Sequence, residues 1–121
     1  MAKKSSEKNI KDLQKMVIAF RDERNWKQFH NPKDVALSLV LEAAEVMEHF
    51  QWKNPEEIKE HIKKNKVEIG EELADVLYWV LLMAHDLNIN LSEAVKDKLG
   101  KNNKKYPVEK SKGRHNKYNK L

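Results

Sequence analysis

The sequence predicts an all-α protein, a helical bundle of four main helices plus a short connecting helix. Three observations favour this fold class. Apolar residues recur at the three- and four-residue spacing of helices, and helix start signals follow one another along the chain. The 121 residues also include only three Gly and three Pro, whereas an all-β fold would need many more turn-forming residues. The length is that of one domain with a single modest core.

The first two helices are predicted from apolar spacing and from a cap. The first covers residues 6–24, where apolar side chains recur at helical spacing from Ile10 to Phe20. After a connector, Asn31 and Pro32 provide a capping side chain followed by proline at the first helical position. The second helix is therefore expected to run from there to about residue 50.

Three further starts complete the bundle. Asn54, followed by proline, opens a short third helix. Asn65 with a Glu three residues later resembles a capping box and opens a long helix to about residue 87. Asn90 has the same pattern and opens a last helix to about residue 105, which Tyr106 and Pro107 end.

Charge is distributed unevenly along the chain. Residues 98–121 hold nine Lys or Arg and one Glu, a net charge of +8, and the rest of the chain is at −3. We expect one domain at residues 1–107 and a basic, flexible tail at residues 108–121. An acidic body with a basic end suits a polyanionic ligand that reaches the acids through a metal ion. Nucleic-acid binding by the tail alone is the less favoured alternative.

The composition excludes several classes of protein. Without cysteine there are no disulfides, zinc–thiolate sites or thiol nucleophiles. Residues 1–4 are followed by polar residues rather than by the apolar segment of a secretory signal. The longest apolar run, residues 76–84, is too short to span a bilayer. We expect a cytoplasmic protein without membrane association.

The second helix and the 65–87 helix are apolar on nearly all sides, which is typical of buried bundle helices. Every residue from Val76 to Met83 is apolar or aromatic, so several of these side chains must face outward from a single chain. We therefore expect a homo-oligomer, either a dimer or a tetramer.

The same two helices carry regularly spaced acids. Glu42 with Glu45, and Glu72 with Asp75, stand three residues apart within apolar runs. Residues at this spacing lie on one helix face, with Cβ atoms roughly 5–6 Å apart, so the four acids converge if the helices pack face to face. Like charges that close are protonated, paired with bases or bridged by cations. Carboxylate ligands suit Mg²⁺ or Mn²⁺. A solvated helix face is the alternative for either pair alone.

These motifs occur in an order that resembles one enzyme family. The E-x-x-E and E-x-x-D pairs are similar to those of the MazG-like all-α NTP pyrophosphatases. Four segments between about residues 10 and 107 resemble its dCTP pyrophosphatase branch in particular. They are ERNWKQFHNP (23–32), EAAEVMEHFQW (42–52), EELADVL (71–77) and KNNKKYP (101–107).

The resemblance implies hydrolysis of a nucleoside triphosphate between its α and β phosphates, with dCTP or a modified dCTP as the substrate. It implies that Glu42, Glu45, Glu72 and Asp75 hold Mg²⁺, with Mn²⁺ as a substitute. One acid is expected to orient or deprotonate the attacking water. We favour Glu45 for this role, with Glu42 as the second catalytic candidate. A broader MazG-like enzyme for several nucleoside triphosphates, or for dUTP, stays open, as does a non-catalytic module that binds nucleic acid.

The resemblance also implies an aromatic pocket for the base and sugar, at positions Trp26, His30, Trp52 and Trp79. The positions that match contacts to the phosphates, the sugar or the base edge are Lys98, Asn102, Lys105 and Tyr106. Core packing is the alternative for the aromatic residues, and a solvated helix end is the alternative for the lysines. Val17 stands where vertebrate members have a His, which leaves the substrate preference open.

Overall fold

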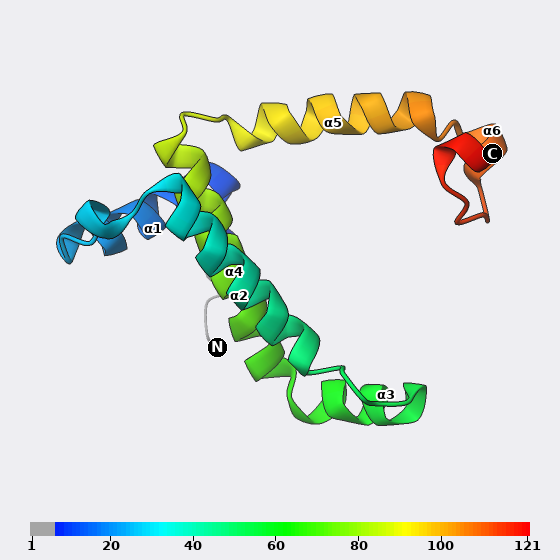
Figure 1. Cartoon of the computed structure of the whole chain (residues 1–121), viewed down its shortest axis with the longest axis horizontal. Coiled ribbons are helices and arrows are strands. Elements are labelled where there is room, and N and C mark those ends of the chain that lie inside the picture. Colours follow the sequence, from blue (N-terminus) through cyan, green and yellow to red (C-terminus); the bar gives the residue numbers. More distant parts are fainter. Residues whose placement is uncertain (1–6) are drawn as a thin grey trace, which may run out of the picture. The chain divides into compact units, whose positions relative to one another are not determined.

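The computed structural model describes residues 7–121, which form helices and no strand. The predicted all-α fold is confirmed. The chain divides into two compact units, one ending at Leu87 and the other starting at Asn88. The first unit holds α1 (Ile10–Glu23), a 3₁₀ turn (Lys27–Phe29), α2 (Pro32–Glu48), α3 (Pro55–Lys64) and α4 (Lys66–Asp86) (Figure 1). The second unit holds α5 (Leu91–Lys105), α6 (Val108–Ser111) and a second 3₁₀ turn (Tyr118–Lys120).

The first unit is built around α2 and α4, which run antiparallel and make the most extensive helix contact (Figure 1). Helices α1 and α3 also pack against α4. The buried apolar residues are Val35 of α2 and Leu81, Leu82 and Ala84 of α4. Fully burying a Val or Leu side chain contributes roughly 1.5–3 kcal/mol. The core therefore lies where α2 begins and α4 ends.

Three of the predicted helix starts are confirmed by their caps. The side chains of Asn31, Asn54 and Asn90 each accept a hydrogen bond from the backbone N–H three residues later, at 2.9, 2.9 and 3.1 Å. Glu57 completes a capping box by accepting the Asn54 N–H at 3.1 Å. Each cap of this kind contributes about 1 kcal/mol to stability.

The predicted starts of the first and fourth helices differ from the structure. Residue 6 lies outside the described residues, and α1 begins at Ile10 after the cap residue Asn9. Asn65 makes no capping hydrogen bond within residues 7–121. Its Nδ2 donates instead to the His61 carbonyl at 3.0 Å and to His61 Nδ1 at 3.2 Å. Asn65 is the only residue between α3 and α4, and its side chain stabilises the end of α3 rather than the start of α4.

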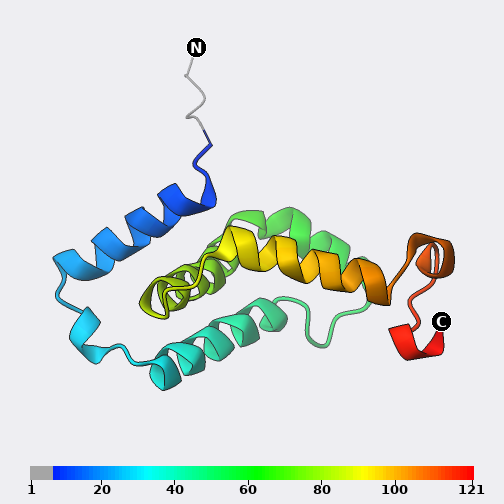
Figure 2. The same ribbon diagram turned by 90° about the horizontal axis from the view of Figure 1, so that it is seen from above.

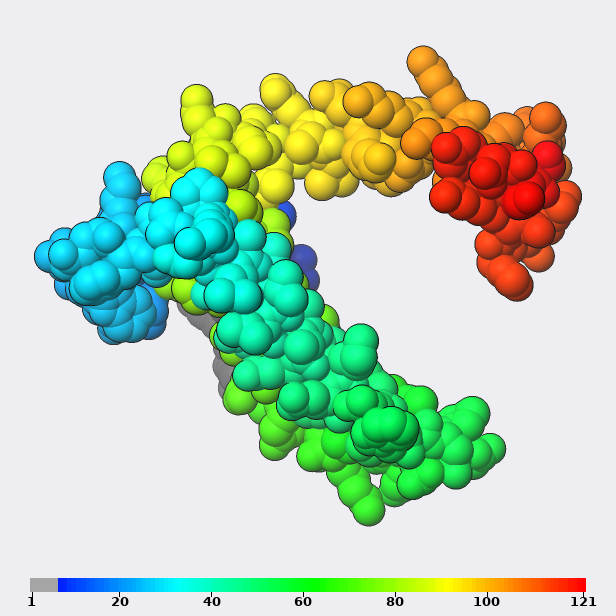
Figure 3. Space-filling view, in the orientation of Figure 1, coloured from blue at the N-terminus to red at the C-terminus, as the bar shows by residue number. Residues whose placement is uncertain are grey.

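Several apolar side chains of the long helices face outward, as the sequence predicts for a single chain. On α2, Leu37, Val40, Leu41 and Met47 are 57–64% exposed. Val40 and Leu41 follow Leu37 by three and four residues, and Met47 lies two turns beyond Val40, so the four side chains lie along one side of the helix. In Figure 3, α2 forms the near face of the first unit. Exposed apolar residues gathered on one helix side are typical of interaction surfaces.

In the second unit, the chain after Pro107 forms short helical turns that contact the end of α5 (Figure 2). The ring of Tyr118 packs edge-on against Tyr106, with centroids 6.1 Å apart, and Lys105 Nζ lies 4.9 Å from the Tyr118 ring centre. The boundary of a separate tail at residue 108 stays a prediction. Among the helices of the described residues, none has the length and apolar character needed to cross a membrane.

Candidate active site

Three of the four predicted metal ligands meet where α2 faces α4. Glu42, Glu45 and Glu72 each place one carboxylate oxygen within 4.8 Å of the others. Glu42 and Glu72 are half-buried, whereas Glu45 is exposed. The antiparallel packing of α2 and α4 brings positions together that lie far apart in the sequence. The result is a carboxylate cluster that solvent reaches through Glu45.

The close approach of these acids shifts their ionisation. The pKa of Glu72 is raised to about 7, first by hydrogen bonding to Glu45 and then by burial and the neighbouring negative charges. The pKa of Glu42 is also raised, chiefly by burial and then by its hydrogen bond to Glu45. Carboxylates this close cannot all be ionised unless a positive charge joins them.

The donor set fits a divalent metal ion. Oε2 of Glu42 and Oε2 of Glu72 are buried and have no hydrogen-bond partner among the described residues. None of the ion pairs that residues 7–121 form involves an acid of the cluster. Mg²⁺ and Mn²⁺ prefer such hard oxygen ligands. A cation at this position would supply the partner that the protein itself does not.

An aromatic cavity of about 440 Å³ adjoins the cluster. Tyr78 and Trp79 both line it, and their rings pack edge to face with centroids 5.0 Å apart. Phe20 packs edge-on against both Trp26 and Tyr78, at 5.8 and 6.2 Å. The residues that line the cavity are Met16, Val17, Phe20, Trp26, Glu42, Asp75, Tyr78 and Trp79. Two predicted metal ligands, Glu42 and Asp75, thus belong to its wall.

The predicted aromatic contacts fall into two groups. Trp26 and Trp79 line the cavity, and His30 packs edge-on against Trp79 with ring centroids 5.4 Å apart. Trp52 is not part of this wall. It lies in the turn between α2 and α3, has a left-handed φ of 68° and is 91% exposed.

The other four predicted substrate contacts all belong to the second unit. Lys98, Asn102 and Lys105 lie on α5, and Tyr106 directly follows it. Asn102 and Tyr106 line one open pocket, Lys98 lines another, and Leu99 contributes to both.

An ion pair that the sequence analysis did not single out lies beside the core, at the end of α4. Arg21 is fully buried, and its Nη1 donates to both carboxylate oxygens of Asp86, at 2.9 and 2.8 Å. One feature of the sequence could have identified Arg21 as a buried residue. It lies on the same face of α1 as the apolar residues Leu13 and Val17, eight and four residues earlier.

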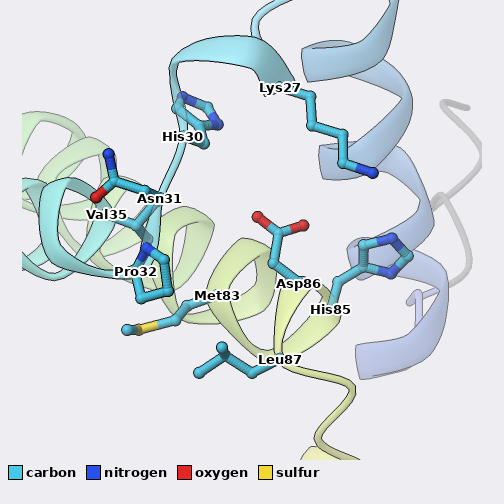
Figure 4. Close-up of a pocket in the computed structure, with 9 residues that line it drawn as sticks. All are labelled: Lys27, His30, Asn31, Pro32, Val35, Met83, His85, Asp86 and Leu87. Carbon is cyan, nitrogen blue, oxygen red and sulfur yellow. The ribbon is translucent and has the colours of Figure 1, made fainter.

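A second cavity, of about 330 Å³, lies beside this ion pair (Figure 4). The Asp86 carboxylate points into it from the end of α4, and Lys27 and His30 approach from the segment that holds the first 3₁₀ turn. Burial, and then the nearby Arg21 charge, lower the pKa of His30. His30 is therefore held in its neutral form near pH 7, and its buried Nδ1 has no partner among the described residues.

Comparisons with known proteins agree with this fold and identify the family. A profile of the MazG-like family matches residues 37–121. Over 119 residues, the chain is 36% identical to dCTP pyrophosphatase 1 of Bos taurus and of Mus musculus, and 33% identical to that of Homo sapiens. These alignments cover 97% of the chain and 70% of each relative.

A solved structure gives the same result. The crystal structure of a pyrophosphatase from Archaeoglobus fulgidus matches with a TM-score of 0.77 and 38% identity, over 88% of this chain and 99% of that one. Together these similarities support a hydrolase that acts on nucleotide phosphoanhydrides. The chain belongs to the MazG-like family.

Proposed function

We propose that the protein is a Mg²⁺-dependent nucleoside triphosphate pyrophosphohydrolase that converts dCTP, or a modified dCTP, and water to the monophosphate and diphosphate. The observation that supports this most is the carboxylate cluster beside an aromatic cavity. A nucleoside triphosphate has the matching parts, a planar base and a polyanionic chain. The similarity to proteins named dCTP pyrophosphatase 1 supports the choice of base.

In this proposal Glu42, Glu45 and Glu72 hold the metal, and Asp75 joins them from the cavity wall. When bound there, Mg²⁺ supplies charge neutralisation for the triphosphate and lowers the pKa of a bound water. Glu45 is the exposed member of the cluster, so it is the acid that an attacking water reaches most easily. We assign it the role of orienting or deprotonating that water, with Glu42 as the second catalytic candidate.

The aromatic residues would bind the nucleoside. Stacking on an aromatic ring is worth roughly 1–3 kcal/mol per base and does not itself select the base. Trp26, Trp79 and His30 therefore account for affinity, and selectivity must come from hydrogen-bonding groups. Trp52, Lys98, Asn102, Lys105 and Tyr106 complete the proposed set of substrate contacts, on the sequence resemblance alone.

We also propose that the protein acts as a homo-oligomer, a dimer or a tetramer. The exposed apolar side of α2 supports this, because water contact with Leu37, Val40, Leu41 and Met47 is unfavourable. Multi-angle light scattering should give two or four times the mass of the chain. A monomer at micromolar concentration would contradict the proposal.

The function is tested by product analysis. Purified protein with Mg²⁺ is incubated with each standard dNTP and NTP and with 5-methyl-dCTP, and anion-exchange chromatography resolves the products. We expect monophosphate and pyrophosphate, most rapidly from dCTP or its modified form, and no reaction with EDTA. Nucleoside diphosphates among the products would contradict cleavage between the α and β phosphates. Equal rates for all substrates would favour the broader MazG-like enzyme, and no turnover at all would overturn the proposal.

A further inference from the structure

The Arg21–Asp86 ion pair is unusual for its burial. Arg21 is the one charged residue in the described part of the chain whose side chain is removed from solvent, and Asp86 is 23% exposed. Burying an ion pair adds little net stability, because the loss of hydration offsets the attraction between the charges. In some proteins such a pair instead fixes the relative geometry of the segments that carry it.

Arg21 lies where α1 leads into the wall of the aromatic cavity. Its backbone carbonyl accepts hydrogen bonds from the N–H groups of Arg24 and Trp26, both at 3.2 Å. Asn25, between them, takes a left-handed φ of 55°, which turns the chain back on itself. The position of Arg21 therefore fixes the position of Trp26, which lines the cavity.

Asp86 anchors the same segment from the opposite side. It is the last residue of α4, about two turns beyond Trp79 on that helix. Asp86 and His30 line the same 330 Å³ cavity (Figure 4), and the His30 ring packs against Trp79. The ion pair thus joins the end of α1 to the end of α4, with the 24–30 segment held between them.

We propose that Arg21 and Asp86 are positioning residues for nucleoside recognition, because they hold segment 24–30 in the conformation that places Trp26 and His30 at the aromatic cavity. The expected change in KM rests on the proposed function. The expected change in the conformation of segment 24–30 does not.

The test replaces the pair with apolar residues of similar size, Arg21→Met with Asp86→Leu. Such replacements of buried ion pairs often keep or raise stability, so the variant is expected to fold. We expect its KM for dCTP to rise roughly tenfold, within the range that base stacking supplies. Its discrimination between dCTP and the other dNTPs should fall, and its kcat and Mn²⁺ affinity should stay within about twofold, a change of less than 0.5 kcal/mol.

Gln14→Met is the matched control. Gln14 Nε2 donates to the Leu81 carbonyl at 2.9 Å, so this variant also removes a contact between α1 and α4, but away from segment 24–30. We expect wild-type KM and wild-type discrimination. Arg21→Lys, which keeps the charge opposite Asp86, should recover part of the affinity that the double variant loses.

Amide hydrogen exchange of the metal-free proteins gives a readout that needs no turnover. Protection of the Trp26 and His30 amides should fall in the double variant and not in Gln14→Met. Unchanged protection, or unchanged KM and discrimination, would overturn the inference. A parallel loss of kcat, Mn²⁺ affinity and thermal stability would also overturn it, since that indicates a general structural role. If the wild type hydrolyses no nucleotide, the proposed function fails, and hydrogen exchange still decides whether the pair positions the segment.

Discussion

The two units of the chain hold their candidate functional residues in different ways. In the first unit, tertiary packing brings Glu42 and Glu72 together from two helices. In the second, Lys98, Asn102 and Lys105 follow one another at helical spacing along α5. The charges differ as well, at −2 for residues 1–87 and +7 for residues 88–121. Substitutions of site residues packed between helices of the first unit should therefore change activity and stability together, whereas those of exposed residues, on α5 for example, should change activity alone.

The largest effect is expected from Glu45→Gln. It removes one of three converging carboxylates, and loss of one preorganised electrostatic contact typically lowers kcat by 10²–10³. We expect turnover to fall by about this factor or more and Mn²⁺ affinity to fall with it, as measured by product formation and calorimetry. In EDTA the variant should be at least as stable as the wild type, because a repulsion between like charges is relieved.

The control for this variant is Glu71→Gln, which removes an exposed carboxylate next to Glu72 on the same helix. Its turnover and Mn²⁺ affinity should match the wild type. If Glu45→Gln kept full activity, the carboxylate cluster would not be the catalytic centre. The first unit would then differ from the second in packing but not in holding the catalytic acids.

The next largest effect separates two tryptophans of the first unit. Trp79 packs against Tyr78 and His30, so Trp79→Ala should lower both thermal stability and nucleotide affinity. The affinity loss should be about 1–3 kcal/mol and similar for every base, because stacking does not select the base. Comparing KM values for dCTP and dTTP, together with the unfolding midpoint, checks this.

Trp52→Ala should behave differently. The 91% exposed side chain buries almost no surface, so the free energy of unfolding should change by less than about 0.5 kcal/mol. If Trp52 contacts the nucleoside, as the sequence resemblance predicts, KM rises while stability stays constant. An unchanged KM would remove Trp52 from the set of substrate contacts.

Local features of the molecule were predictable from the sequence, and tertiary ones were not. The caps at Asn31, Asn54 and Asn90 depend on neighbours three residues away, so the sequence alone identifies them. Asn65 has the same local pattern, but His61 competes for its side chain. The competing partner decided the outcome, and local spacing does not reveal it.

The candidate site shows the same division. Three-residue spacing predicted which acids share a helix face, and the structure brings three of the four together. The aromatic cavity needs Phe20 and Tyr78 beside Trp26 and Trp79, and the first two carry no motif of their own. The Arg21–Asp86 pair joins residues 65 positions apart, a contact that depends on how α1 and α4 pack.

A smaller effect is expected on α5. Lys98→Ala should raise KM by up to roughly tenfold if the ammonium group contacts phosphate, since charge-assisted contacts are worth about 1.5–3 kcal/mol before screening by salt. The increase should be greater at low ionic strength. Lys112→Ala, which removes the same charge beyond α6, serves as the control. Equal effects of the two variants would indicate general attraction to the basic unit rather than a contact on α5.

The smallest effect concerns pH and the junction of α2 with α3. Asn65 Nδ2 donates to the His61 carbonyl and to His61 Nδ1, so Nδ1 is an acceptor and the proton of His61 is on Nε2. That Nε2–H then donates to His49 Nδ1, 2.8 Å away. The chain of hydrogen bonds requires a neutral His61. Its pKa is lowered by burial, and then by the positive charge of Lys53 and by His49.

A lowered pKa in the folded state fixes the sign of the pH dependence. The contribution of His61 to stability is complete above its ordinary pKa of about 6.5 and is lost as pH falls through its lower folded value. The unfolding midpoint of the wild type should therefore fall between pH 7 and pH 5 more steeply than that of His61→Gln, as measured by calorimetry in EDTA. His115→Gln, in the second unit, should follow the wild type. Parallel curves for His61→Gln and the wild type would show that packing alone holds α3 in place, because protonation of His61 would then leave the junction unchanged.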